Sequence, residues 1–89
     1  MTDDEQSRRR RAIYRAAHRG TKEMDWLLGR YAETAVAGMS LEGLARFERL
    51  IGLPDPEIYD MIFNPQLSSG TGYGDLIAEL RGFHGLQRD

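Results

Sequence analysis

Apolar residues recur at helical spacing in five segments of the chain, and each segment is bounded by residues that typically begin or end helices. In the first segment, Ser7 stands as an N-cap before a predicted helix over residues 8–18. Gly20 is expected to adopt the left-handed conformation that ends this helix. The helix carries a stripe of arginines (Arg8, Arg11, Arg15 and Arg19) beside a stripe of small apolar residues (Ile13, Ala16 and Ala17).

A second helix is predicted from Thr21, its N-cap, to about Gly38. Glu23 and Asp25 lie in its first turns, where the positive end of the helix dipole favours carboxylates. Trp26 points away from the apolar face, so its indole is either exposed or in contact with another helix. The residues expected to face the core are Met24, Leu27, Leu28, Tyr31 and Ala35.

The third and fourth helices have similarly clear boundaries. Ser40 is the predicted N-cap of the third helix, and Gly52 is expected to stop it. Asp55 is the predicted N-cap of the fourth helix, and Pro56 suits its first position because the proline ring fixes φ near the helical value. The apolar face of the third helix comprises Leu41, Leu44, Phe47 and Ile51, and the fourth has two stripes, Ile58, Met61 and Ile62 beside Tyr59 and Phe63.

The last segment completes an all-α domain. Residues 68–74 are rich in turn formers and are predicted to be a flexible loop. Asp75 is then expected to cap a fifth helix, which buries Leu76, Ile77, Leu80 and, at its end, Phe83. No strand pattern or internal repeat is present. We therefore expect a single-domain bundle of about five short helices over residues 8–84, a disordered leader over 1–7 and a frayed tail over 85–89.

The composition agrees with one small folded domain. The chain has 89 residues, of which 40% are hydrophobic and 29% charged, as in soluble globular proteins. The absence of cysteine excludes disulfides and thiol chemistry. The chain has neither a run of apolar residues long enough to span a bilayer nor a signal-peptide pattern, so a cytoplasmic location is expected.

Charge is unevenly distributed along the chain. Residues 1–22 contain seven basic and three acidic side chains, whereas residues 23–89 contain five basic and eleven acidic ones. The arginine run at residues 8–11 could bind the phosphates of a nucleic acid. However, no nucleic-acid-binding motif is present and the isoelectric point is near 5.6. A nucleic-acid-associated or antitoxin-type helical module is therefore the alternative interpretation.

Candidate catalytic groups are few. The chain has two histidines, His18 and His84, and no metal-ligand spacing, so we expect no catalytic residue and no metal site. The glycines at positions 70, 72 and 74 follow no strand and lack the lysine and hydroxyl residue of a phosphate-binding loop. These observations indicate a binding protein and not an enzyme.

The corner between the first two predicted helices, residues 19–25, combines several groups suited to binding. Gly20 exposes backbone to a partner, Arg19 can offer a bidentate fork, and Glu23 can accept hydrogen bonds one turn later. A purely structural interpretation is also open, in which Gly20 only ends a helix and Glu23 only stabilises the helix dipole.

Two segments of the chain resemble a known family. Residues 19–25 (Arg-Gly-Thr-Lys-Glu-Met-Asp) fit the Arg-Gly-x-x-Glu motif, with its following apolar-Asp pair, of the succinate dehydrogenase assembly factor 2 family, whose bacterial members are called SdhE. Residues 50–59 (Leu-Ile-Gly-Leu-Pro-Asp-Pro-Glu-Ile-Tyr) are similar to a second recurrent segment of that family. The resemblance extends over about residues 8–81.

This resemblance implies a five-helix, chaperone-like factor. It would bind the flavoprotein subunit of succinate dehydrogenase or fumarate reductase and promote covalent attachment of FAD to a histidine of that subunit. The factor itself would bind no cofactor stably and would act on FAD held by the partner. We expect a monomer. The partner-binding residues that we expect are Arg19, Gly20, Glu23 and Asp25 of the first motif, Asp55 and Pro56 of the second segment, and Trp26 as an interface anchor.

Overall fold

The computed structural model describes residues 4–86, which contain five α-helices, two short 3₁₀ helices and no strand. The all-α prediction is therefore confirmed. The helices are α1 (Asp4–Ala17), α2 (Lys22–Ala35), α3 (Leu41–Ile51), α4 (Asp55–Phe63) and α5 (Gly74–Phe83), with 3₁₀ helices η1 (Val36–Gly38) and η2 (Pro65–Ser68) between them. None of the helices in this range is long and apolar enough to cross a membrane.

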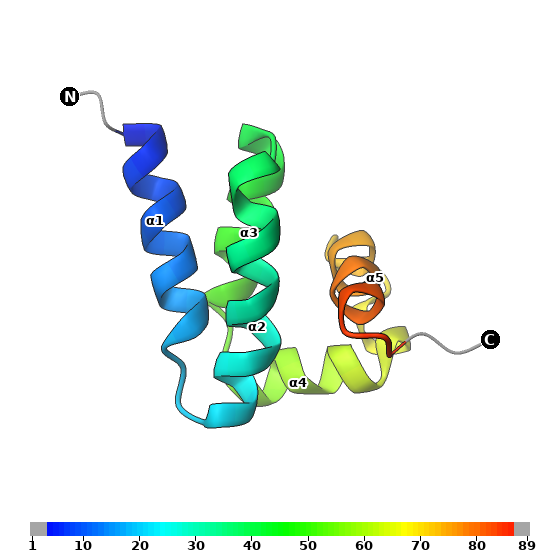
Figure 1. Ribbon diagram of the computed structural model, residues 1–89. Coiled ribbons are helices and arrows are strands. Elements are labelled where there is room, and N and C mark those ends of the chain that lie inside the picture. Colours follow the sequence, from blue (N-terminus) through cyan, green and yellow to red (C-terminus); the bar gives the residue numbers. More distant parts are fainter. Residues whose placement is uncertain (1–3, 87–89) are drawn as a thin grey trace.

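The first three helices form one packed group, and the last two extend to one side of this group. α1 and α2 are antiparallel neighbours, and α3 packs behind them (Figure 1). α4 runs across the lower end of this group, and α5 packs against α4 and α2 on the side away from α1 (Figure 1). As a result, the connection between α1 and α2 and the start of α4 lie at the same end of the molecule.

Two of the predicted helix caps form as expected. The Thr21 hydroxyl accepts a hydrogen bond from the Met24 N–H at 3.1 Å, and the Ser40 hydroxyl accepts one from the Gly43 N–H at 3.0 Å. Each bond satisfies one of the backbone donors that the first turn of a helix leaves without a partner. The starts of α2 and α3 were therefore predicted correctly from the sequence.

Three other predicted caps were wrong. α1 begins at Asp4, so Ser7 lies inside it; an ion pair of 2.7 Å between Glu5 and Arg9, one turn apart, stabilises this extra turn. Asp55 and Asp75 are also helical residues, preceded by Pro54 and Tyr73 at the cap positions. Residues 1–3 and 87–89, parts of the predicted leader and tail, lie outside the described residues.

Neither Gly20 nor Gly52, two glycines that were expected to end helices, has a left-handed backbone. Among the described residues, φ is positive only at Gly70, Gly72 and Gly85, and not at Gly20. The prediction of a left-handed Gly20 was therefore wrong, because α1 already ends at Ala17 and the chain then turns through an irregular connection. Gly52 ends α3 in the right-handed region.

The predicted flexible loop at 68–74 is a series of hydrogen-bonded turns. Ser68 is buried, and its hydroxyl donates to the Pro65 carbonyl at 2.7 Å. The Thr71 hydroxyl donates to the Ser68 carbonyl at 2.6 Å and accepts from the Tyr73 N–H at 3.0 Å. Gly70 and Gly72 supply the two positive φ angles that these turns require.

The core agrees with the predicted apolar faces except at their ends. Leu41 and Phe83 are about half exposed, since each lies in an end turn of its helix. Tyr59 and Phe63 also remain on the surface, with ring centroids 4.6 Å apart, so the second apolar stripe of α4 is exposed. The largest fully buried side chains are Leu27, Leu28, Val36, Leu44, Phe47, Leu50, Ile51, Ile58, Ile62, Ile77 and Leu80.

Two arginines of the basic run hold helices together. Arg8 donates two hydrogen bonds to the Glu48 carboxylate of α3, at 2.7 and 3.2 Å. Arg9 donates to the Val36 carbonyl at 2.6 Å, beyond the end of α2. The arginine run is therefore in part a structural feature of the bundle and not only a basic surface.

The contact between Arg8 and Glu48 makes a prediction about pH. The hydrogen bonds from Arg8, together with its charge, lower the pKa of Glu48 from its ordinary value of 4.5. The ionised carboxylate therefore stabilises the fold at pH values above 4.5, and this stabilisation is lost as the pH falls through the lowered pKa. We expect Glu48→Gln to be less stable than wild type at neutral pH and to lose less stability on acidification.

Urea midpoints measured at a series of pH values below and above 4.5 would test this expectation. Glu42→Gln, which replaces an exposed carboxylate on the same helix, serves as the control. Parallel curves for wild type and Glu48→Gln would contradict the assignment.

Candidate functional site

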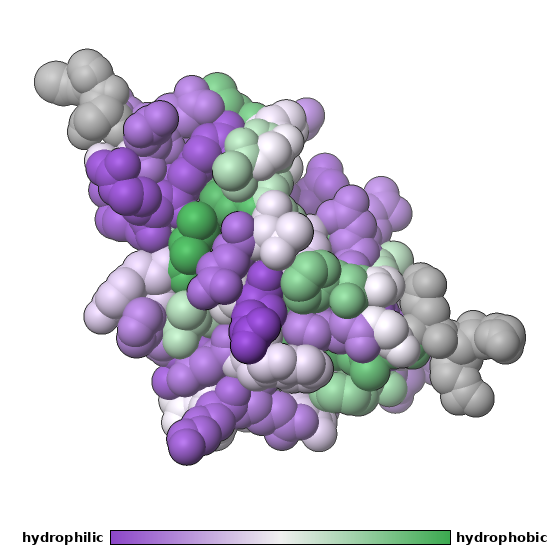
Figure 2. All heavy atoms as spheres, in the orientation of Figure 1, coloured by the Kyte–Doolittle hydropathy of each residue, from purple (hydrophilic) through white to green (hydrophobic). Residues whose placement is uncertain are grey.

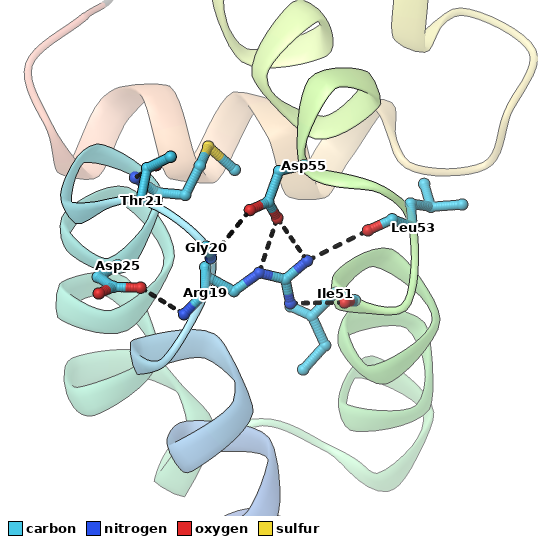
Figure 3. Close-up of polar contacts among 8 residues, drawn as sticks. Arg19, Gly20, Thr21, Asp25, Ile51, Leu53 and Asp55 are labelled. Atoms are coloured by element: carbon cyan, nitrogen blue, oxygen red, sulfur yellow. Dashed lines mark hydrogen bonds and ion pairs between the residues drawn. The ribbon is translucent and has the colours of Figure 1, made fainter.

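Arg19 lies at the centre of the corner, residues 19–25, and its guanidinium points into the molecule. Its Nε donates to Oδ1 of Asp55 at 2.9 Å, and its Nη2 lies 2.7 Å from the same oxygen (Figure 3). Its Nη1 donates to the Ile51 carbonyl at 2.6 Å, and Nη2 also donates to the Leu53 carbonyl at 3.2 Å. The Arg19 side chain is only 11% exposed. All three of its nitrogens therefore have acceptors inside the protein, and the fork is not offered to a partner.

Asp55 connects the start of α4 to the corner through both carboxylate oxygens. While Oδ1 accepts from Arg19, Oδ2 accepts from the backbone N–H of Gly20 at 3.3 Å (Figure 3). This use of the carboxylate explains why Asp55 does not cap α4. Because a charged hydrogen bond is stronger than a neutral one, the pair fixes the corner against the connection between α3 and α4.

Asp25 and Thr21 hold the corner from the side of α2. The Asp25 carboxylate accepts a hydrogen bond from the backbone N–H of Arg19 (Figure 3). The Thr21 hydroxyl caps α2, and its carbonyl accepts from the Asp25 N–H at 3.0 Å. The backbone of residues 19–21 is thus fixed by α2 and α4 together.

The outer side of the corner is a shallow pocket of about 220 Å³. Glu23, Asp55 and Pro56, which lie up to 33 positions apart in the sequence, line it together. Tyr59, one turn after Asp55, forms a further wall of the pocket. The sequence pattern indicated this residue only as part of an apolar stripe. Its position four residues after Asp55 was the signal that could have placed it here. The remaining lining residues are Thr21 and Met24.

The pocket presents one carboxylate that is free to bind. Glu23 is exposed and makes no hydrogen bond or ion pair with any residue in the range 4–86. The Asp55 carboxylate is instead held by Arg19. An acidic pocket of this kind suits a basic or hydrogen-bond-donating group and disfavours phosphate. Within the same range, no cluster of three or more His, Asp or Glu could hold a metal ion.

Trp26 lies away from this pocket. Its indole packs against the imidazole of His84, with ring centroids 4.3 Å apart, and is 49% exposed. His84 is held in turn by a contact of 2.7 Å between Nε2 and the Leu27 carbonyl. The sequence left open whether Trp26 is exposed or contacts another helix. Its indole is half exposed and also contacts His84, and this contact connects α2 to the end of α5.

The corner and the start of α4 coincide with the two segments that carry the family resemblance, and comparison with known proteins decides the family. The model of the Sdh5 family, described as the flavinator of succinate dehydrogenase, matches residues 10–84. The chain belongs to this family. Its description denotes a factor that serves another enzyme, in agreement with the prediction that the chain is not an enzyme itself.

Individual relatives are similar over part of the chain. The FAD assembly factor SdhE of Acetobacter pasteurianus is 43% identical over 61 residues, which cover 68% of this chain and 56% of the relative. Mitochondrial succinate dehydrogenase assembly factor 2 of Cryptococcus neoformans is 35% identical over 57 residues, 64% of this chain and 33% of the relative. The corresponding factor of Debaryomyces hansenii is 38% identical over 52 residues, 58% and 37% respectively.

The chain thus spans between a third and just over half of the length of these relatives. No solved structure was found to match the chain.

Proposed function

We propose that this member of the Sdh5 family binds the flavoprotein subunit of succinate dehydrogenase, or of the related fumarate reductase, and promotes the covalent attachment of FAD to a histidine of that subunit. The family match over residues 10–84 supports this function. The docking element in this proposal is the corner, residues 19–25, and its support is that hydrogen bonds within the chain already hold its backbone in place.

The chain acts on this reaction by positioning. Attachment requires the flavin to become electrophilic and the histidine of the partner to attack it, and these reacting groups belong to the flavoprotein. Holding two reacting groups in the correct geometry lowers the barrier substantially without any catalytic side chain. This factor would therefore stabilise the arrangement of the flavoprotein in which its histidine meets the FAD that it already holds.

The residues of the corner divide into two roles in this proposal. Gly20 and Glu23 contact the partner, with Pro56 and Tyr59 forming the wall beside them. Arg19, Asp25 and Asp55 act through the backbone that they hold in place. This division changes the interpretation of Arg19 from a partner-binding residue to a positioning residue.

The test is the covalent flavin on the flavoprotein when both proteins are produced together. We expect Glu23→Ala to reduce covalent flavin at least about tenfold, because it removes the one free carboxylate of the pocket. Glu42→Ala, which removes an exposed carboxylate on α3, should leave it unchanged. Flavin fluorescence of the denatured subunit in a gel measures the product. Wild-type fluorescence with Glu23→Ala would remove Glu23 from the site.

Gly20 provides a second test, which separates docking from folding. A Cβ at this position would approach only Asp55 Oδ2, at 3.6 Å, and φ is not left-handed, so a Cβ can be added here without a clash or backbone strain. We expect Gly20→Phe to keep the wild-type melting temperature and to abolish covalent flavin, because the ring blocks close approach of the partner. Gly38→Phe, at an open position, is the control. Unfolding of Gly20→Phe would instead show that Gly20 has a structural role only.

A further inference from the structure

A second surface feature, separate from the corner pocket, follows the outer seam between α1 and α2. It is an open groove of about 680 Å³, and its apolar lining includes Ile13, Tyr14 and Ala17. Figure 2 shows a patch of hydrophobic residues in the region of this seam, with hydrophilic residues on either side. Tyr14 is 63% exposed and stacks on His18 with ring centroids 3.9 Å apart, so a large aromatic surface faces solvent in the groove.

The groove continues toward the corner. A second depression of about 300 Å³ shares Ala17 and Glu33 with the groove and extends to Lys22 and Trp26. The floor is low where the two depressions meet, because Gly29 of α2 has no side chain to fill the seam beside Ala17. We call the two depressions together the α1–α2 groove. Its length along two antiparallel helices suits an extended or helical segment of a partner.

The α1–α2 groove is predominantly basic. Five basic residues line it, and only Glu33 and Asp25 oppose them; the Asp25 carboxylate already accepts from the backbone of Arg19. None of the five forms an ion pair with a carboxylate in the part of the chain that the structure describes. The charges of Arg10, Lys22 and Arg30 are therefore available to a ligand of opposite sign, whereas Arg11 and Arg15 also interact with the Glu48 carboxylate of α3, whose pKa they help to lower. The five residues are Arg10, Arg11, Arg15, Lys22 and Arg30.

We infer that the α1–α2 groove binds an acidic, amphipathic segment of the same flavoprotein that docks at the corner, an inference that rests on the proposed function. The arginines select an acidic ligand, and the apolar floor requires that the ligand also carry apolar side chains. A nucleic-acid duplex would place phosphates against the same arginines but would leave Ile13 and Tyr14 uncovered. Continuity of the groove with the corner favours the flavoprotein over a second copy of this chain.

The test uses a matched pair of double variants and the purified flavoprotein subunit with FAD bound but not yet covalently attached. Arg10→Glu with Tyr14→Ser reverses one charge and removes one exposed aromatic ring in the groove. Arg49→Glu with Leu41→Ser makes the corresponding change at exposed positions of α3. All of these side chains are exposed, so both variants should keep the wild-type circular dichroism and melting temperature. Calorimetric titration at low and high salt gives the dissociation constants.

We expect the groove variant to bind the flavoprotein at least about tenfold more weakly than wild type, with a smaller dependence on salt, and the control to bind within about twofold of wild type. If the groove variant binds as tightly as wild type while wild type still promotes covalent flavin attachment, the groove inference fails and the proposed function stands. If wild type neither binds the flavoprotein nor promotes attachment, both fail.

Two further outcomes would also overturn the groove inference. A wild-type dimer in gel filtration that the groove variant abolishes would identify a second copy as the occupant. Nucleic acid that copurifies with wild type and is lost from the groove variant would identify that ligand instead.

Discussion

Replacing Arg19 with alanine should destabilise the protein by about 2–4 kcal/mol, because the change breaks a mostly buried charged network. Without the guanidinium, the Asp55 carboxylate keeps only its bond to Gly20, and the carbonyls of Ile51 and Leu53 lose their donor. In a domain of this size, a loss of 2 kcal/mol lowers the melting temperature by about 8–16 °C. Thermal unfolding followed by circular dichroism measures the effect.

Arg19→Lys separates the stability that comes from the hydrogen-bond network from the stability that comes from the positive charge alone. Lysine keeps the positive charge but cannot donate in three fixed directions to Asp55, Ile51 and Leu53 at once. We therefore expect Arg19→Lys to recover less than half of the lost stability. Arg49→Ala removes an exposed arginine and should change the melting temperature little. A fully stable Arg19→Ala protein that failed to bind the flavoprotein would show that the guanidinium contacts the partner after all.

The second large effect is expected at Gly29, where α1 and α2 lie close together. A Cβ at this position would lie 2.9 Å from Cα and 3.0 Å from Cβ of Ala17, and the backbone of α1 would have to move away. Overpacking of this kind costs about 1–3 kcal/mol. Alanine regains about 1 kcal/mol of helix propensity relative to glycine, so we expect Gly29→Ala to destabilise the fold by up to about 2 kcal/mol.

Urea unfolding of Gly29→Ala beside Gly38→Ala would measure this loss. Nothing lies within 4 Å of a Cβ at Gly38, so the control should be neutral or slightly stabilising. An unchanged midpoint for Gly29→Ala would mean that α1 shifts without cost. A lower midpoint would confirm that the crossing of the two helices depends on the missing side chain.

Local signals explain which parts of the fold could be predicted. Thr21 and Ser40 cap helices because a hydroxyl at that position reaches the backbone of its own first turn, whatever the rest of the chain does. Asp55 has the same local preference, but its carboxylate accepts a hydrogen bond from Arg19, 36 positions away, and does not cap α4. Sequence periodicity contains no information about such a contact, so the cap prediction failed there.

The candidate site shows the same limit. The motif brought Arg19, Gly20 and Glu23 to attention together, and the structure places all three at one corner. Which of them faces outward depends on the carbonyls of Ile51 and Leu53, and no side-chain pattern indicates these. The close approach at Gly29 was missed for a related reason. A glycine within a helical pattern indicates only a lower helix propensity unless the residue that packs against it is known.

The contact between Trp26 and His84 offers a spectroscopic handle. The chain contains one tryptophan, so its intrinsic fluorescence comes from a single place, half exposed, at the junction of α2 and the end of α5. Emission from the native protein should report whether that junction is closed, independently of helix content. Binding of a ligand at the end of the α1–α2 groove that contains Trp26 should therefore change this fluorescence, so the binding can be followed in real time without an attached dye.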